Sequence, residues 1–244
     1  MPSAKSKHNK AILAQSKPKF FSMVRSLHLA DYLTLGNGVC GCLAVLFAMR
    51  SLITQDPTFL YLSFCLVPIG VFLDAMDGAV ARWRKATSLL GQELDSLADL
   101  ITFGIAPAIL GFACGMQTIL DIFVLCYFVC CGLSRLARYN ATVASMPKNE
   151  SGKIKYYEGA PIPSSLIIVI ILAYGVYTGK FWNFENVPRS DNGYISPFKI
   201  AFTGKNVWGN EVKVISRFFI HPFVLIYAIS GTMMISKRLR IPKF

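Results

Sequence analysis

The sequence has few charged residues for its length, and it lacks cysteine or histidine patterns that would bind zinc. Only 16% of its 244 residues are Asp, Glu, Lys or Arg, whereas 54% are hydrophobic. A soluble domain of this length needs many more charges to cover its surface, so the composition excludes an ordinary water-soluble fold. The apolar residues gather into stretches long enough to cross a bilayer. The chain is therefore predicted to be an all-α polytopic membrane protein.

The seven cysteines lie inside apolar stretches, and no histidine stands at ligand spacing from any of them. Neither the adjacent pair Cys130-Cys131 nor the pair Cys40 and Cys42 matches a metal-binding motif. The cysteines are interpreted as packing residues, because a free thiol behaves as a small hydrophobic group.

The N-terminal segment is basic. Residues 1–17 contain four lysines, no acidic residue and no hydrophobic period, which predicts a disordered tail. In residues 18–30, apolar residues recur at helical spacing beside basic ones, which predicts an amphipathic helix on an anionic membrane surface. A helical extension of the first span is the alternative. No cleavage pattern of a signal peptide follows, so residues 31–244 are expected to form one membrane domain that inserts without processing.

Six apolar stretches are predicted to cross the membrane as helices, with an amphipathic helix before the first. They are Leu33–Met49, Phe59–Arg82, Leu90–Gly111, Ile119–Ala137, Pro161–Tyr177 and Phe218–Ile235. Lys and Arg concentrate in the tail, at 82–85, at 135–155 and in the last eight residues, so these segments are predicted to lie in the cytosol. Both termini then lie there too, and the mixed-charge loop 179–217 falls on the far side.

A dense polar pattern interrupts the second and third predicted spans. From Asp74 the chain reads DAMDGAVARWRKATSLLGQELDSLADL, which contains D-x2-D-G-x2-A-R-x8-G-x3-D-x3-D. Helical spacing places Asp74 and Asp77 on one face of the first helix, and Asp95 and Asp99 on one face of the next. A short basic turn joins the two helices as an antiparallel pair. The four carboxylates are therefore predicted to meet near the cytosolic interface.

Four carboxylates at membrane depth repel one another and need strong compensation. Divalent cations with oxygen ligands supply it, so we expect two Mg²⁺ or Mn²⁺ ions held by Asp74, Asp77, Asp95 and Asp99. Ordinary ion pairs with the basic residues of the turn are the alternative, but they would not explain the glycines of the pattern. Gly78 and Gly91 fit places where the backbone approaches a nucleotide or its phosphates closely.

The whole pattern resembles the signature of the CDP-alcohol phosphotransferase family, with every fixed position filled. The resemblance implies that Asp95 and Asp99 act in catalysis, with Asp99 accepting the proton of an alcohol nucleophile. It also implies a homodimer and a binding site for the CDP-lipid. The residues implied to form that site are Asp77, Gly78, Ala81, Arg82, Ser88 and Gly91.

The stretches SLADLITFGIAPA and SRLARYN, with EGAPIP at 158–163, resemble the phosphatidylserine synthase branch of this family, and its fungal members in particular. This likeness runs over roughly residues 30–180. It implies transfer of a phosphatidyl group from CDP-diacylglycerol to L-serine, with no nucleic-acid partner. The likeness to fungal members favours the endoplasmic reticulum membrane, and the plasma membrane of a microbe is the alternative. A transferase of this kind would work among membrane lipids and release CMP.

The acceptor site is expected near Arg135 and Arg138, which stand at i and i+3 at the end of the fourth span. Their guanidinium groups suit an anion such as the serine carboxylate. The phosphate of glycerol phosphate or inositol phosphate would suit them as well, and anchoring at lipid headgroups is a further alternative. Asn37, in the first span, is another candidate for contact with serine.

Two other functions remain open at this point. Synthesis of phosphatidylglycerophosphate or of a phosphatidylinositol lipid would use the same chemistry with another acceptor. A divalent-cation transporter would also place aspartates around metal, but it has no use for the basic turn or for Gly78.

Overall fold

The structure of the chain is a computed structural model that describes residues 29–84, 89–142, 156–178, 212–215, 218–236 and 240–242. The predicted disordered tail, Ser88 and most of the loop 179–217 lie outside these ranges. The predicted interfacial helix also lies outside them, apart from its last two residues, which belong to the first described helix.

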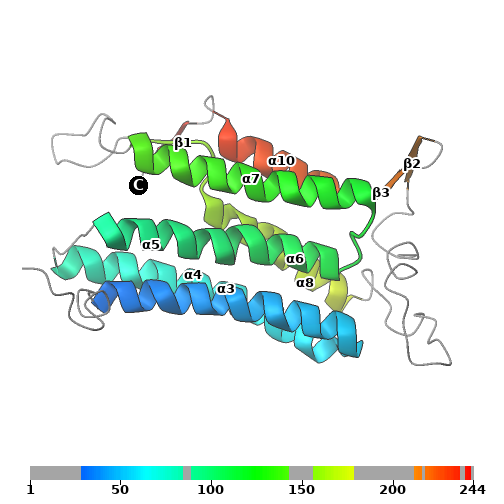
Figure 1. Cartoon of the computed structure of the whole chain (residues 1–244), viewed down its shortest axis with the longest axis horizontal. Coiled ribbons are helices and arrows are strands. Elements are labelled where there is room, and N and C mark those ends of the chain that lie inside the picture. Colours follow the sequence, from blue (N-terminus) through cyan, green and yellow to red (C-terminus); the bar gives the residue numbers. More distant parts are fainter. Residues whose placement is uncertain are drawn as a thin grey trace, which may run out of the picture.

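Helices make up nearly all of the described chain (Figure 1). The α-helices are α3 (Leu29–Thr54), α4 (Pro57–Arg84), α5 (Leu89–Asp99), α6 (Ala106–Ala113), α7 (Ile119–Thr142), α8 (Ser165–Tyr177) and α10 (Val224–Ile235). A π-helical segment, Leu100–Ile105, joins α5 to α6 without a break, and a single 3-10 turn, Ile162–Ser164, leads into α8. Four short strands complete the structure as two antiparallel pairs: β1 (Tyr156–Glu158) with β4 (Arg240–Pro242), and β2 (Val212–Ile215) with β3 (Phe218–Ile220).

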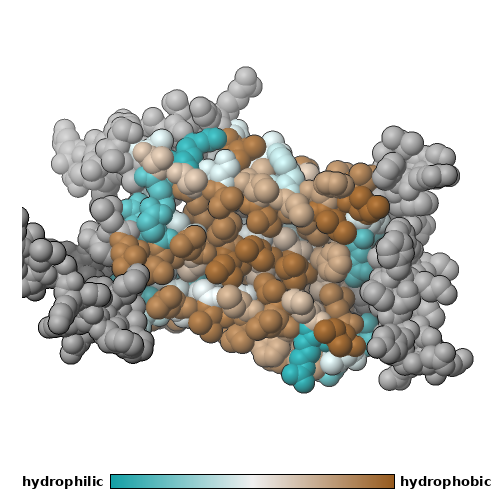
Figure 2. Space-filling model, viewed as in Figure 1, coloured by the Kyte–Doolittle hydropathy of each residue, from teal (hydrophilic) through white to brown (hydrophobic). Residues whose placement is uncertain are grey.

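Four described stretches are long and apolar enough to cross a membrane: Ala30–Thr54, Pro57–Val80, Leu90–Ala113 and Ile119–Thr142. Two shorter apolar helices, Ile162–Tyr177 and Val224–Ile235, accompany them. Hydrophobic side chains cover the middle of the face seen in Figure 2, and hydrophilic side chains gather toward its two ends. The prediction of an all-α, multi-pass membrane protein is confirmed.

With α5, the π-helical segment and α6 taken as one rod, successive helices run in opposite directions, so their ends collect at the two ends of one bundle (Figure 1). Helices α3, α5 and α8 begin, and α4, α7 and α10 end, at what we call the proximal end. The strand pair of β1 with β4 lies there too. The opposite end, where β2 and β3 lie, is the distal end.

Helix α3 packs along α4 and also contacts α5 and the π-helical segment. These elements pack tightly around Thr102, which is fully buried. A Cβ atom at Gly41 would lie 2.5 Å from the Thr102 Oγ1 atom, and one at Gly70 would lie 2.6 Å from its Cγ2 atom. Only glycine at both positions lets the three elements approach this closely.

Helix α10 is fixed to α6 and α7 by its buried Tyr227. The Tyr227 hydroxyl donates a hydrogen bond of 2.7 Å to the Pro107 carbonyl, and its ring meets Phe128 edge to face at 5.2 Å. Gly111 makes room for this ring, since a Cβ atom there would lie 2.7 Å from the hydroxyl oxygen.

The predicted sixth span, Phe218–Ile235, is wrong in its first part. Phe218–Ile220 form strand β3, a turn follows, and α10 begins only at Val224. The cause lies at His221, whose backbone N–H donates to the buried Asp121 carboxylate at 3.1 Å, and at Pro222, which has no backbone N–H to donate. The helix has 12 residues, about 18 Å at 1.5 Å per residue, which is shorter than a hydrocarbon core of about 30 Å.

Candidate active site

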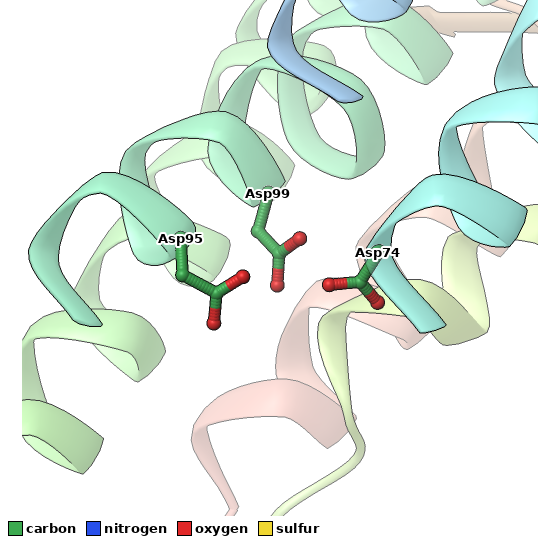
Figure 3. Close-up of side chains that lie close together, drawn as sticks. All are labelled: Asp74, Asp95 and Asp99. Carbon is green, nitrogen blue, oxygen red and sulfur yellow. The ribbon is translucent and has the colours of Figure 1, made fainter. Parts of the chain in front are cut away.

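Three of the four predicted aspartates meet at the proximal end. Asp74 comes from α4, and Asp95 and Asp99 come from α5; their carboxylates point toward one another (Figure 3). One carboxylate oxygen from each residue lies within 4.8 Å of the others. The i, i+4 spacing on α5 places two of these side chains on one helical face, and the antiparallel neighbour α4 supplies the third.

The donor set fits a divalent cation. Each of the three carboxylates is partly buried, and the Asp95 Oδ1 atom is buried with no hydrogen-bond partner among the described residues. A buried carboxylate oxygen without a partner is costly, and three carboxylates this close also repel one another. Hard divalent cations with oxygen ligands relieve both costs.

Asp77 lies on the same helix as Asp74 but outside this group of three. Its carboxylate is buried, with 6% of the residue exposed, and its Oδ2 atom accepts a hydrogen bond of 2.6 Å from the Thr34 hydroxyl of α3. Thr34 is buried as well. A short hydrogen bond to a carboxylate is among the stronger ones in proteins, so α3 holds Asp77 firmly.

Asn37 lies one turn further along α3 and is fully buried. Its side-chain nitrogen donates to the Asp99 Oδ1 atom at 3.3 Å, and its backbone carbonyl accepts from the Thr102 hydroxyl at 2.9 Å. The side-chain oxygen faces Gly70, where a Cβ atom would lie 2.9 Å away. The structure therefore places Asn37 against Asp99 and the helix interface, and its contact with serine stays a prediction.

Open space lies beside Gly78, four residues after Asp74. A Cβ atom built at Gly78 would meet no heavy atom of the described chain within 4 Å. Gly91 is half-buried near the start of α5. Ala81 and Arg82 lie in the last turns of α4, where only the backbone is described, and Ser88 lies outside the described residues. The space at Gly78 is where the predicted CDP-lipid site would begin.

The two predicted acceptor-binding arginines, Arg135 and Arg138, are half-buried near the end of α7. The Arg138 Nη1 atom donates a hydrogen bond of 3.3 Å to the carbonyl of Ile235, the last residue of α10. Helix α7 is also tied to α5, because the Asn140 side-chain nitrogen donates to the Ser96 hydroxyl at 3.0 Å. The arginines thus stand at the proximal end, where α5, α7 and α10 meet.

Two features of the site were missed by sequence analysis. Asp31 is a further buried acid at the proximal end, with 5% of the residue exposed, and it forms a stripe with Thr34 and Asn37 at every third position of α3. Polar residues at this spacing in an otherwise apolar window were the signal from which this buried polar face could have been predicted. The π-helical segment that starts directly after Asp99 had no signal in composition, although such segments often occur at functional sites.

Residues 27–189 match the sequence profile of the CDP-alcohol phosphatidyltransferase family. The chain belongs to this family. The matched range contains every residue of the site described above, from Asp31 on α3 to the arginines of α7. The predicted family membership is confirmed.

The chain is also similar to curated members of the family. It is 43% identical over 224 residues to a protein of Saccharomyces cerevisiae named CDP-diacylglycerol–serine O-phosphatidyltransferase, covering 91% of this chain and 73% of that protein. Proteins of the same name from Bacillus subtilis and Methanocaldococcus jannaschii are 35% identical over 144 residues and 30% identical over 150 residues. These alignments cover 58% and 62% of this chain, and 73% and 62% of the two relatives.

Proposed function

We propose that this chain transfers the phosphatidyl group of CDP-diacylglycerol to L-serine and so forms phosphatidylserine and CMP. The observation that carries the proposal is the group of three carboxylates within 4.8 Å of one another, in a chain that belongs to the CDP-alcohol phosphatidyltransferase family. The choice of serine is supported by the name of the yeast relative, which is 43% identical over 91% of this chain.

Asp74, Asp95 and Asp99, with Asp77 beside them, would hold the divalent cations, for which two Mg²⁺ or Mn²⁺ ions are our proposal. When bound, such ions neutralise charge on the diphosphate and on the leaving nucleotide. Burial of the unpartnered Asp95 oxygen supports this assignment, because that atom otherwise has no compensation among the described residues.

Asp99 is proposed to accept the proton of the serine hydroxyl, which is a poor nucleophile at neutral pH. The hydroxyl oxygen forms a bond to the phosphorus that carries the lipid, and the bond from that phosphorus to the bridging oxygen breaks. The bonding electrons leave with CMP. The hydroxyl proton passes to the Asp99 carboxylate, whose other oxygen is held by Asn37.

The nucleotide end of the lipid substrate is proposed to lie along the ends of α4 and α5. The open space at Gly78 supports this, because any side chain there would occupy it. Gly91 and Ala81 would allow the same close approach, while Arg82 and Ser88 would bind phosphate oxygens. Asp77 would border this site as well as the metal.

Serine is proposed to bind beside the arginines of α7, with Arg135 pairing with its carboxylate. Arg138, which is engaged with α10, would contribute charge and hold the wall of the site. Both termini and the proximal end would face the cytosol, in the endoplasmic reticulum membrane, and the chain would act as a homodimer. Basic flanking segments and the family resemblance support these last assignments.

The test of this function is a comparison of acceptors with the purified full chain. CDP-diacylglycerol and Mn²⁺ would be supplied with L-serine, glycerol 3-phosphate, inositol or inositol phosphate in separate reactions, and the lipid products identified by mass spectrometry. The Asp74→Asn protein, prepared in parallel, controls for contaminating activity. Phosphatidylserine should form from serine alone. Turnover with a phosphorylated acceptor, with serine inert, would reject the assignment.

A further inference from the structure

Helix α3 reaches two aspartates on two other helices through side chains that stand one turn apart. Thr34 donates to the Asp77 Oδ2 atom of α4 at 2.6 Å, and Asn37 donates to the Asp99 Oδ1 atom of α5 at 3.3 Å. Both donors are buried, with 4% of Thr34 and none of Asn37 exposed. The i, i+3 spacing puts both on one face of α3, so a single rigid helix contacts both halves of the aspartate motif.

Each of these hydrogen bonds engages one named oxygen of a carboxylate. An ionised carboxylate has two oxygens and only accepts hydrogen bonds, so a donor bound to one of them fixes its rotation about the Cβ–Cγ bond. For Asp99, this rotation decides whether the second oxygen faces the neighbouring carboxylates of Asp74 and Asp95. Charge-assisted hydrogen bonds from buried donors are strong enough to hold such an orientation.

The backbone of Asn37 is also held in place. Its backbone carbonyl accepts from the Thr102 hydroxyl at 2.9 Å, and Thr102 is wedged against Gly41 and Gly70. Thr102 lies in the π-helical segment that follows Asp99 directly. The donor and the carboxylate it orients therefore belong to one tightly packed unit, with little freedom for the Asn37 side chain to turn toward a substrate.

We propose that Asn37 and Thr34 are positioning residues of the transferase reaction. Asn37 orients Asp99 as the proton acceptor, and Thr34 orients Asp77 toward the metal site. Neither residue contacts serine. The inference rests on the proposed function and replaces the role in serine binding that the sequence indicates for Asn37.

The two residues should give different kinetic signatures. Asn37→Leu removes the donor at nearly constant size, so kcat should fall roughly tenfold to hundredfold, as expected for a lost hydrogen bond to a charged group. The KM for serine should stay unchanged, and saturating Mn²⁺ should not restore kcat. Thr34→Val should instead weaken Mn²⁺ binding roughly tenfold to hundredfold, and saturating Mn²⁺ should restore most of its kcat.

The experiment measures Mn²⁺ binding by calorimetry without substrates, then kcat and KM at saturating Mn²⁺, for the full chain in lipid nanodiscs. Thr34→Ser keeps the hydroxyl and should restore wild-type Mn²⁺ affinity. Ser63→Ala is the matched control. Ser63 of α4 is also fully buried and donates to the Ala44 carbonyl of α3, so it links the same two helices as the Thr34–Asp77 bond. Ser63→Ala should lower thermal stability without changing kcat, KM or Mn²⁺ affinity. Asn37→Ala replaces Asn37→Leu if the leucine variant does not fold.

A raised KM for serine with unchanged kcat in Asn37→Leu would overturn the proposal, because it would mean direct contact with the acceptor. Unchanged Mn²⁺ affinity in Thr34→Val, or equal losses in Ser63→Ala, would overturn it as well. The kinetic measurements use whichever acceptor the enzyme turns over, and the Mn²⁺ binding measurements use no acceptor. The test therefore still holds if the acceptor is not serine.

Discussion

Arg138 of α7 donates a hydrogen bond of 3.3 Å to the carbonyl oxygen of Ile235, the last residue of α10. The carbonyls at the end of a helix have no partner within the helix and carry the negative end of its dipole, so an arginine there is doubly favourable. Arg138 therefore has a structural task at the junction of α7 and α10. Arg135 keeps its proposed role in binding the acceptor.

Lysine substitutions should separate these tasks, because lysine keeps the charge but loses the planar fork of the guanidinium group. Arg135→Lys should raise the KM for serine roughly tenfold to hundredfold, as a charged hydrogen bond of about 1.5 to 3 kcal/mol is lost. Arg138→Lys should mainly lower the midpoint of thermal unfolding. Steady-state kinetics and a melting curve for each variant distinguish acceptor binding from a structural role. If Arg135→Lys instead lowers the affinity for CDP-diacylglycerol and leaves the KM for serine unchanged, this arginine belongs to the phosphate site.

Asp99→Asn should fold and still bind CDP-diacylglycerol and metal measurably, yet it should hardly turn over. An amide cannot accept the proton of the serine hydroxyl, and loss of a general base typically costs about 10²- to 10⁴-fold in rate. The measurement is kcat at saturating Mn²⁺ together with binding of the lipid substrate. Retention of more than a small fraction of wild-type turnover would reject the role of general base.

At the distal end, Asp121 should be essential for stability but not for chemistry. It is fully buried, accepts from the backbone N–H groups of Thr118 and His221 at 3.1 Å each, and lies 2.5 Å from the His221 ring. Asp121→Ala leaves these donors buried without the carboxylate, which should cost roughly 3 to 5 kcal/mol of unfolding free energy. A clear fall in melting temperature with normal kcat at low temperature is expected. Thr178→Ala, at an exposed helix end, is the control and should melt like the wild type.

Asn140 and Asn149 both begin a glycosylation acceptor pattern, Asn140-Ala-Thr142 and Asn149-Glu-Ser151, yet both should stay unmodified. The proximal end is proposed to be cytosolic, and the Asn140 nitrogen already donates to Ser96 at 3.0 Å and to Glu93 at 3.3 Å. Expression in a glycosylating cell should give one mass, insensitive to endoglycosidase. A sensitive mass shift that disappears in Asn149→Gln would mean that the proposed orientation is inverted.

Periodicity predicted the helices and the helical faces that the aspartates share, because both depend on local geometry. The i, i+4 spacing of Asp95 and Asp99 fixes a shared face wherever the helix lies. The helical stretches longer than 18 residues were likewise visible in hydropathy alone.

The parts that failed depend on contacts between distant residues. Nothing near Phe218 in the sequence indicates that Asp121, a hundred residues before His221, forms hydrogen bonds with it. These bonds help to delay the start of the last helix until Val224. The partner of Asn37 was equally hidden, because it depends on how α3 rotates against α5. The π-helical segment changes the hydrogen-bond register without changing composition, so no pattern of residue types predicts it.

Release of CMP with and without serine tests most directly whether the phosphatidyl group passes straight to serine at the aspartate cluster. The purified chain would be given CDP-diacylglycerol and Mn²⁺, and CMP and phosphatidylserine would be quantified over the same time course. A single in-line displacement predicts CMP only when serine is present, with one phosphatidylserine formed for each CMP. Equal release of CMP in the absence of serine would contradict direct transfer, because the phosphatidyl group would then pass to water or to the protein itself.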